Sequence, residues 1–565
     1  MKTGLNRTHR SILLSAVILA LGACGGGGGG SSSSTAPAPA PTPTPPAPVP
    51  PVEPPPNEIN ISMAEGARFL RQASFGPADG DVTSLQTIGY EVWIDNQMIA
   101  PASSQLLHLA SLPTPENAFE GQTNRLEAFF QHALENDDQL RQRMAFALSE
   151  IMVVSDDGIL FNRPGGLASY YDMLSSHAFG NFRDLIEAVT LHPAMGVYLS
   201  MLGNEKPDTA RNIRPDENYA RELLQLFTIG LVELNLDGTP RLNSSGQMIP
   251  TYDQSIIEGF AHVNTGWTFG GSPAFTSPRP NFLVPMQAFP DFHDTGEKQL
   301  LNGFVVPAGQ TPEQDLADAL DNIFAHQNVG PFISIRLIQR FTSANPSPAY
   351  VERVATVFND NGNGVRGDLG AVIKAILLDD EARTVVAGGT GGKLVEPLLR
   401  LVSLWRAFDA SAANGRYVYP QPNLAFGQAP LRSPSVFNFF SPDYAPSGEL
   451  SVQGLVSPEM QITNETTTAS VNDYLAFSIY IRNSSAANLG EQAIAIDIAP
   501  YLGLAGAPEA LLDRMAEKLT GGVISSELRT QALAMINTIP GNQPAFRVTE
   551  AIHQIASSVE FALIE

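Results

Sequence analysis

The stretch of sequence that best defines the fold is polar in its first half and apolar in its second half. It reads Arg214-Pro-Asp-Glu-Asn-Tyr-Ala-Arg-Glu-Leu-Leu-Gln-Leu-Phe-Thr-Ile-Gly230. Asp216 is a favourable helix N-cap, and the glutamate after it suits the positive end of a helix dipole. At helical spacing the charged and apolar side chains fall on opposite sides. The stretch therefore predicts an amphipathic helix over residues 217–231.

The polar face of this predicted helix carries the first candidate catalytic group. Glu217 and Glu222 supply two carboxylates and Arg221 an orienting cation, a combination suited to acid–base or metal chemistry, with Asn218 as a candidate binding residue. The alternative is a solvated or structural face, in which an exposed Glu217–Arg221 pair contributes only about 0.2–0.5 kcal/mol. Spacing alone favours this alternative.

A second polar cluster follows a long loop rich in glycine and proline. His293 and Asp294 are candidate metal ligands, and Lys298 nearby is a candidate binding residue. Imidazole with carboxylate suits zinc, manganese or iron better than calcium, so a divalent metal is the cofactor that these residues suggest; any other cofactor is unknown. There is no His-Glu-x-x-His pair and no cysteine pair, and a polar loop is the favoured alternative.

A third segment, residues 432–443, is dense in aromatic residues and prolines and contains a single arginine. Arg432 is a candidate binding residue. The segment either lines a pocket or packs a long loop onto the core, because loops of this length are usually functional or disordered. The sequence leaves both interpretations open.

The N-terminus has the pattern of a secretory signal. Three basic residues precede the apolar run Ser11–Leu21, which is too short to span a membrane, and Leu21-Gly-Ala-Cys24 resembles a bacterial lipobox. Cys24 is the only cysteine in the sequence, so it forms no internal disulfide and is the predicted lipidation site. With Gly25 following the cysteine, the sequence predicts a lipid anchor in the outer membrane or at the cell surface.

Composition then divides the chain into four predicted parts. Residues 1–23 are a signal peptide, 24–58 a lipidated cysteine with a Gly/Ser/Pro-rich disordered tether, 59–470 a helical main domain, and 471–565 a C-terminal helical extension. Helical periodicity dominates the body, and apolar runs that suggest strands are few and short. The predicted fold is mainly α: a large multi-helix globular body with few short strands, such as Phe282-Leu-Val and Phe304-Val-Val.

The net charge of the chain makes some classes of binding partner unfavourable. The sequence has 33 basic and 57 acidic residues, a net charge of −24, so electrostatic repulsion disfavours nucleic acid and anionic lipid surfaces. The predicted contact with a membrane is through the lipid anchor alone. The 43% of hydrophobic residues is sufficient for a large core.

Several motifs in this order resemble the bacterial domain of unknown function 1800 family. They are Arg68-Phe-Leu-Arg-Gln-Ala-Ser-Phe-Gly-Pro77, Leu140-Arg-Gln-Arg-Met-Ala-Phe-Ala-Leu-Ser149, the run from Glu217 to Gly230, Thr265-Gly-Trp267, His293-Asp294 with Lys298, and Ser433-Pro-Ser-Val-Phe-Asn-Phe-Phe440. The resemblance implies an exported, mostly helical bacterial protein, with an exported sulfatase-like protein encoded nearby as a possible partner. It implies no reaction. The family pattern has His where this chain has Phe227, which weakens a catalytic role for the helix.

Two functions remain open from the sequence. The first is an exported, surface- or outer-membrane-anchored lipoprotein of unassigned biochemical activity that acts as an envelope-associated binding or assembly factor. The alternative is a metal-dependent hydrolase acting on an envelope or extracellular substrate. The sequence favours the first because it contains neither a complete nucleophile triad nor a closed metal site.

Overall fold

The computed structural model describes residues 60–384, 391–481 and 493–564, so the predicted signal, Cys24 and tether lie outside the described residues. Residues 52–565 form one structural unit. The predicted mainly α fold is confirmed, with strands present only as short pairs. Among the described helices, none is long and apolar enough to cross a membrane.

The first part of the body is a run of helices whose ends follow local rules. The first begins at Ser62, whose side chain caps Glu65 N while the Glu65 carboxylate accepts from Ser62 N at 2.8 Å. Pro193 starts a new helix at its first position and ends the one before it. The helices are α1 Met63–Ala73, α2 Asp81–Ile88, α3 Tyr90–Ile99, α4 Gln105–Ser111, α5 Ala118–Glu135, α6 Gln139–Ser149, α7 Pro164–Ser176, α8 Phe182–Leu191 and α9 Pro193–Tyr198.

The rest of the body is also helical. The middle helices are α10 Asn218–Glu222, α11 Gln254–Val263, α12 Pro312–Ala325, α13 Val329–Phe341, α14 Pro348–Asn359, α15 Leu369–Leu378 and α16 Asp380–Arg383. The last are α17 Pro397–Ala407, α18 Pro422–Phe426, α19 Glu449–Val452, α20 Glu465–Tyr480, α21 Pro508–Thr520, α22 Ser526–Thr538, α23 Pro544–Ala556 and α24 Val559–Ala562. The predicted boundary at residue 470 falls inside α20.

The strands form three antiparallel two-residue pairs, of which β5 with β6 joins segments far apart in the sequence. They are β1 Trp267–Thr268 with β2 Gln287–Ala288, β3 Lys298–Gln299 with β4 Val305–Val306, and β5 Lys393–Leu394 with β6 Leu563–Ile564. The predicted strand near Phe304 is present as β4. The one at Phe282-Leu-Val is wrong, because these residues form a bend.

The predicted helix over residues 217–231 differs from the one observed. Only α10 is α-helical, and it continues directly into a π-helix, η2 (Leu223–Thr228). Ile229 N and Gly230 N both donate to Leu224 O at 3.0 Å, and the Thr228 hydroxyl donates to Leu223 O at 2.5 Å. Widened turns of this kind occur frequently at functional sites.

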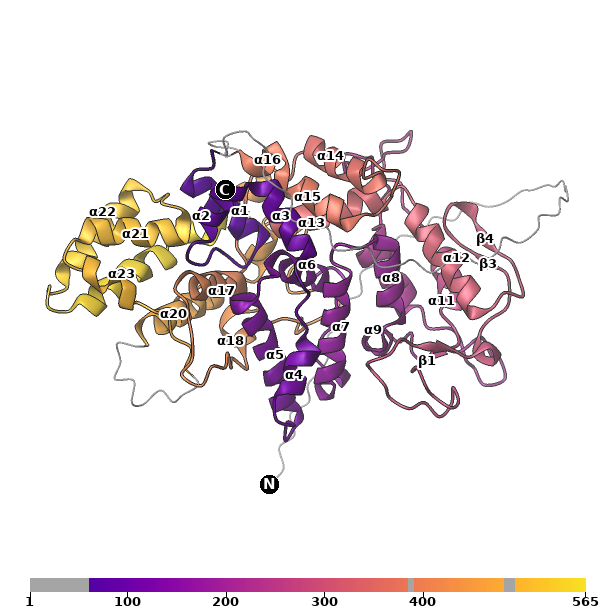
Figure 1. Cartoon of the computed structure of the whole chain (residues 1–565). Helices are drawn as coiled ribbons and strands as arrows, with labels where there is room; N and C mark the ends of the chain where they lie inside the picture. Colours follow the sequence, from indigo (N-terminus) through magenta and orange to yellow (C-terminus); the bar gives the residue numbers. More distant parts are fainter. Residues whose placement is uncertain (1–59, 385–390, 482–492, 565) are drawn as a thin grey trace, which may run out of the picture. The chain divides into compact units, whose positions relative to one another are not determined.

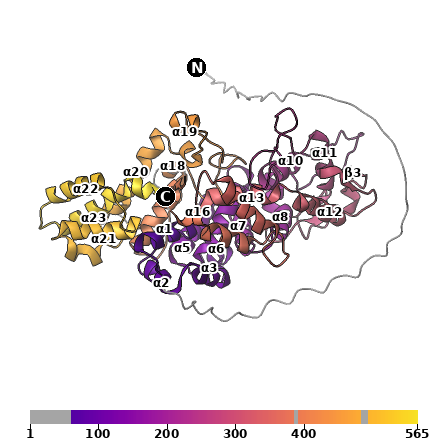
Figure 2. The same cartoon turned by 90° about the horizontal axis from the view of Figure 1, so that it is seen from above.

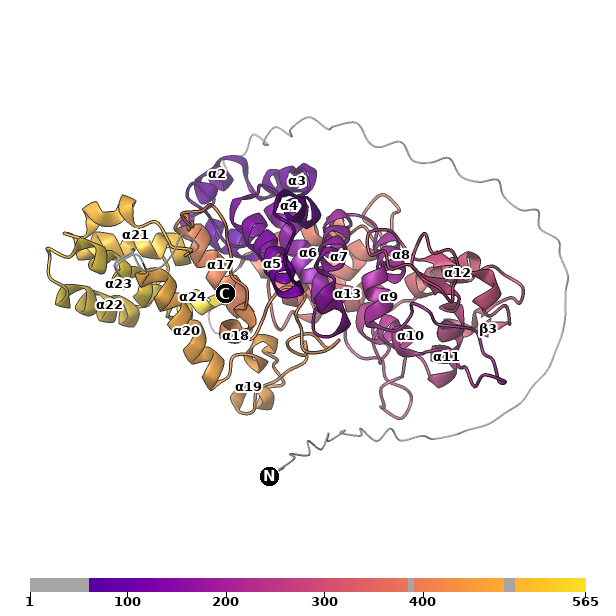
Figure 3. The same cartoon turned by 90° about the horizontal axis from the view of Figure 1, so that it is seen from below.

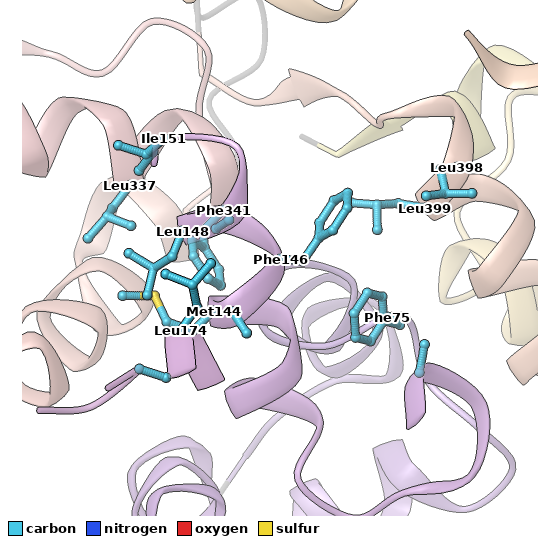
Figure 4. Close-up of a cluster of buried hydrophobic side chains, with 14 of the residues drawn as sticks. Phe75, Met144, Phe146, Leu148, Ile151, Leu174, Leu337, Phe341, Leu398 and Leu399 are labelled. Carbon is cyan, nitrogen blue, oxygen red and sulfur yellow. The ribbon is translucent and has the colours of Figure 1, made fainter. Parts of the chain in front are cut away.

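One hydrophobic core runs through the unit. Figure 4 shows Met144, Phe146 and Leu148 of α6 between side chains of α13, such as Phe341, and of α17, such as Leu398. Every residue of helix α6 except Arg141 is buried, so these side chains pack on several sides of it.

The C-terminal helices pack against this core. Helices α21, α22 and α23 contact one another and lie together in Figures 1 and 2. Trp405 Nε1 of α17 donates to Ser478 Oγ of α20 at 2.6 Å, and β6 pairs with β5. Figure 3 shows α20 beside α18, which it contacts.

Candidate functional site

The polar face of the predicted helix is divided between solvent and interior. Glu217 Oε2 and Arg221 Nη2 are 2.9 Å apart, and the two side chains are 34% and 41% exposed. Gln254 Nε2 at the start of α11 donates to both carboxylate oxygens of Glu217, at 3.0 and 2.9 Å. Asn218 is exposed. These contacts are those of a solvated helix face, and the catalytic role of Glu217 and Arg221 stays a prediction.

Glu222 is the member of this group that points inward. Its side chain is buried and Oε2 has no hydrogen-bond partner among the described residues. Burial raises its pKa, and the charge of Arg221 partly opposes this shift. Burial also raises the pKa of Tyr198 and of Tyr252 to about 12, and the nearby charge of Glu222 adds to both shifts.

His293 and Lys298 are held in a buried ion cluster. His293 Nε2 lies 3.0 Å and Lys298 Nζ 2.6 Å from the same oxygen, Oδ2 of Asp315 on α12. His293 Nδ1 lies 2.9 Å from the carbonyl oxygen of Thr265. Both imidazole nitrogens are therefore used by the protein, which fits a structural link between the 293–298 loop and α12.

Asp294 turns away from His293 and forms a pair with His262 at the end of α11. The hydrogen bond from His262 is the main cause that lowers the pKa of Asp294 to about 2. Gln254, which contacts Glu217, lies eight residues before His262 on α11, a separation of about 12 Å along the helix axis. The structure therefore does not join the two predicted clusters in one site.

No group of three or more His, Cys, Asp or Glu side chains suited to a metal ion occurs among the described residues. The metal role of His293 and Asp294 stays a prediction.

Arg432 anchors a loop in the interior. Its guanidinium donates to Asp156 Oδ1 and Oδ2 at 2.8–3.0 Å and to the carbonyl oxygen of Pro420 at 3.0 Å. Asp156 is buried and also pairs with Arg125 at 3.0 Å. These contacts fix the aromatic segment 432–443 against α5 and the loop after α6.

A cavity of about 630 Å³ lies between the π-helix, α13 and this aromatic segment. We call it the Glu150 pocket. Its walls are apolar and come from η2 and the loop after it, from α13 and from residues 436–443: Leu226, Ile229, Leu231, Val232, Leu234, Pro240, Phe332, Ile335, Val436, Phe437, Phe440 and Pro442. Residues of the segment 436–443 line the cavity, while Arg432 packs the start of the same segment onto the interior, so the segment has features of both sequence interpretations.

The inner end of the Glu150 pocket is polar. Glu150 Oε2 lies 3.2 Å from Arg340 Nη1, and neither atom has a hydrogen bond of normal geometry among the described residues. The Arg340 guanidinium is stacked on Phe440, 4.6 Å from the ring centre. Asn438, at φ 66°, is buried with an unpartnered Nδ2. A left-handed Asn with an unused donor at a cavity is typical of a binding site.

Behind the pocket, the buried side-chain amide of Gln428 donates hydrogen bonds to Glu150 and to a second glutamate. Gln428 Nε2 donates to Glu150 Oε1 at 2.8 Å and to Glu396 Oε2 at 2.6 Å. Burial, with the charge of Glu396, raises the pKa of Glu150 to about 8, against the opposing charge of Arg340. Burial would also raise the pKa of Glu396, but the charges of Lys393 and Arg340 hold it below its ordinary value. These shifts favour the protonated form at Glu150 and the ionised form at Glu396.

Sequence reasoning missed Glu150, Arg340 and Asn438. Glu150 directly follows the motif Leu140–Ser149, and Asn438 lies within the motif Ser433–Phe440. These two motifs were therefore the sequence signals that could have pointed to Glu150 and Asn438. Arg340 carried no local signal, because its importance comes from contacts with segments far away in sequence.

Comparison with family models gives a match over residues 68–563 to the family described as Protein of unknown function (DUF1800). Comparison with curated proteins and with solved structures gives no match. The matched region extends beyond the motifs of the sequence, the last of which ends at Phe440, and includes the C-terminal helices. With nearly all of the described body covered, the chain belongs to the DUF1800 family.

Proposed function

We propose that this chain is an exported, lipid-anchored protein of the bacterial envelope that binds an amphipathic ligand in the Glu150 pocket. One observation carries the proposal: apolar walls end at two buried donors, Asn438 Nδ2, which has no hydrogen bond among the described residues, and Arg340 Nη1, which lies 3.2 Å from Glu150 Oε2 without a hydrogen bond of normal geometry. Leaving a donor such as Asn438 Nδ2 unpaired is unfavourable by about 1–3 kcal/mol. A ligand with an apolar body and acceptor oxygens at one end would accept from Asn438 and attract Arg340.

The cavity suits a ligand of moderate size, because small-molecule sites usually occupy about 300–1,000 Å³ and are mainly apolar with a few directed polar groups. Burial favours the protonated form of Glu150, and the guanidinium of Arg340 beside it favours a carboxylate or amide end group over a cation; Arg336, which also lines the cavity, lies 3.5 Å from Asp443.

Titration calorimetry with decanoate and with an N-acetylated tetraleucine peptide tests the proposal. Ile335→Trp fills the pocket and should weaken binding at least about tenfold, since the indole occupies the ligand's volume. Leu107→Trp, at an exposed position on α4, is the matched control and should bind as the parent does. Equal binding by Ile335→Trp and Leu107→Trp would contradict the proposal.

A second candidate function is hydrolysis of the bound ligand, and the raised pKa of Glu150 beside Arg340 favours it. Glu150 would donate a proton to the leaving group. Glu150→Gln should then abolish turnover of ester or amide ligands while retaining binding. The metal-dependent form of this hypothesis requires His293 and Asp294, so metal analysis of the parent and of His293→Ala tests it separately.

The envelope location rests on Cys24 and the tether sequence, and the sulfatase-like partner rests on the family resemblance. Cys24→Ala should release the chain from the membrane fraction. Crosslinking in intact cells should recover the exported sulfatase-like protein; recovery of the chain alone would count against that partner.

A further inference from the structure

A second cavity, of about 370 Å³, lies on the other side of α1 from the core and shares no lining residue with the Glu150 pocket. We call it the arginine pocket. Three arginines line it: Arg68 and Arg71 on successive turns of α1, and Arg383 at the end of α16. In a chain of net charge −24, three cations at one cavity are a local reversal of charge.

None of the three arginines has a carboxylate partner in an ion pair among the described residues. Arg71 Nη2 donates to the carbonyl oxygen of Phe561 at 2.6 Å. Arg68 Nε and all three guanidinium nitrogens of Arg383 are buried without a hydrogen bond of normal geometry, although the Tyr90 hydroxyl is a hydrogen-bonding neighbour of Arg383. The Arg383 guanidinium lies over the rings of Phe69 and Tyr90, at 5.0 and 5.5 Å, which holds it in place without neutralising it.

The two carboxylates at the pocket are used elsewhere. Glu65 is hydrogen-bonded to Ser62 in the capping box of α1, and Glu560 accepts from the Ser525 hydroxyl at 2.6 Å. Glu65 still attracts Arg68 and Arg383 at longer range, and that attraction lowers its own pKa after the larger effect of the Ser62 bonds. The cavity therefore keeps three cationic groups against two carboxylates that are already bonded to serines.

The arginines remain charged in spite of their burial. Burial, and then the charge of Arg400, lowers the pKa of Arg71 to about 10; burial, and then the charge of Arg68, lowers that of Arg383 to about 10. Both values lie well above neutral pH. Three cations against two carboxylates in a partly buried site are unfavourable, and an anion that accepts several guanidinium hydrogen bonds reduces this repulsion.

We propose that the arginine pocket binds an oxyanion, the phosphoryl or carboxylate group of a small molecule or of a lipid headgroup. The planar donor groups of Arg68 and Arg383 would bind its oxygens, and Arg71 would add a third cation from the next turn of α1. Thr520 also lines the cavity, but it is buried and its hydroxyl donates to the carbonyl oxygen of Ala516 at 3.0 Å. The site is independent of the function proposed for the Glu150 pocket.

Calorimetric titration of the full chain with inorganic phosphate, and then with acetate, tests this inference. We expect saturable binding at one site and a concentration-dependent rise in Tm. Arg383→Gln should weaken phosphate binding on the order of tenfold, since it removes a charge-assisted bond. Arg529→Gln is the matched control, because Arg529 forms an exposed pair with Asp513 and does not line the cavity, and it should bind as the parent does.

Vesicles distinguish the source of the anion. Binding to phosphatidylglycerol vesicles but not to phosphatidylcholine vesicles, lost in Arg383→Gln, identifies a headgroup; binding of free phosphate alone identifies a soluble ligand. Arg68→Gln provides a second variant in case Arg383→Gln does not fold. Absence of saturable binding of phosphate, acetate and both vesicles by the parent overturns the inference, as does binding that neither variant weakens.

Discussion

Glu150 and Glu217 show how position within the fold decides what a carboxylate can do. Glu217 stands at the surface, bonded to Arg221 and Gln254, and water screens these contacts. Glu150 is buried beside Arg340 and shares Gln428 with Glu396, so its protonation is coupled to its neighbours. The sequence marked Glu217 through its helical pattern, whereas the environment of Glu150 depends on residues up to hundreds of positions away.

Glu150→Gln should change the pH dependence of stability. Because the pKa of Glu150 is raised from 4.5 to about 8, its favourable contribution is full below pH 4.5 and is lost as pH rises through 8. The parent should lose on the order of a few kcal/mol more stability than Glu150→Gln between these pH values. Urea unfolding at several pH values measures this. Glu352→Gln, at an exposed position on α14, is the control; if it flattened the profile equally, the assignment to Glu150 would be wrong.

Removal of Arg432 should destabilise the fold far more than removal of Arg221. Arg432→Ala leaves buried Asp156 with Arg125 as its remaining ionic partner and frees the carbonyl of Pro420, at a cost of about 2–3 kcal/mol. Arg221→Ala breaks an exposed pair and should cost about 0.5 kcal/mol or less. Chemical denaturation of the two variants measures their losses in unfolding free energy, and similar losses would show that Arg432 is not a structural anchor.

At the scale of elements, local sequence rules indicated where helices start, but not where a helix widens into a π-helix. Thr311 and Gln314 form a capping box at the start of α12, and Pro193 separates α8 from α9, both as sequence patterns indicate. The π-helix η2 has no such pattern, because its extra residue per turn is stabilised by packing against α13. That widened turn presents Leu226 and Ile229 to the Glu150 pocket.

Gly230→Ala should damage the pocket at the end of η2. Gly230 has φ +72°, and a Cβ there would lie 2.9 Å from the ring of Phe332, a pocket-wall residue. We expect a loss of about 2–4 kcal/mol in unfolding free energy and weaker decanoate binding.

Gly246→Ala is the matched control for this substitution. Gly246 has φ +76° with nothing within 4 Å of the added Cβ, so only backbone strain of about 1 kcal/mol is expected, with decanoate binding unchanged. Thermal unfolding and calorimetry of both variants separate the two effects. Equal stability losses in the two variants would contradict the predicted contact with Phe332.

At the scale of the whole molecule, the mainly α architecture followed from periodicity, while the candidate pocket did not. The polar network behind it joins Glu150, Arg340, Glu396, Gln428 and Glu459, which come from widely separated parts of the chain. Lys393 Nζ completes it, 2.9 Å from Glu459 Oε1. A network of this kind is specified by tertiary contacts, so neither residue spacing nor a local motif reveals it.

The C-terminal helices should unfold together with the rest of the body. Trp405 of α17 donates to Ser478, Phe408 contacts Tyr501 at a ring separation of 5.7 Å, and β6 pairs with β5. Calorimetry should therefore show one cooperative transition, and a chain ending at residue 470 should aggregate or lack native near-UV circular dichroism. A stable native-like fragment 60–470 would instead support the independent extension predicted from the sequence.

The most direct test of the central claim, that the Glu150 pocket is a ligand site, is calorimetric titration of decanoate into the parent chain and Ile335→Trp. The account predicts saturable one-to-one binding by the parent and at least about tenfold weaker binding by Ile335→Trp, with Leu107→Trp unchanged. Saturable binding of equal strength in the parent and Ile335→Trp would contradict it.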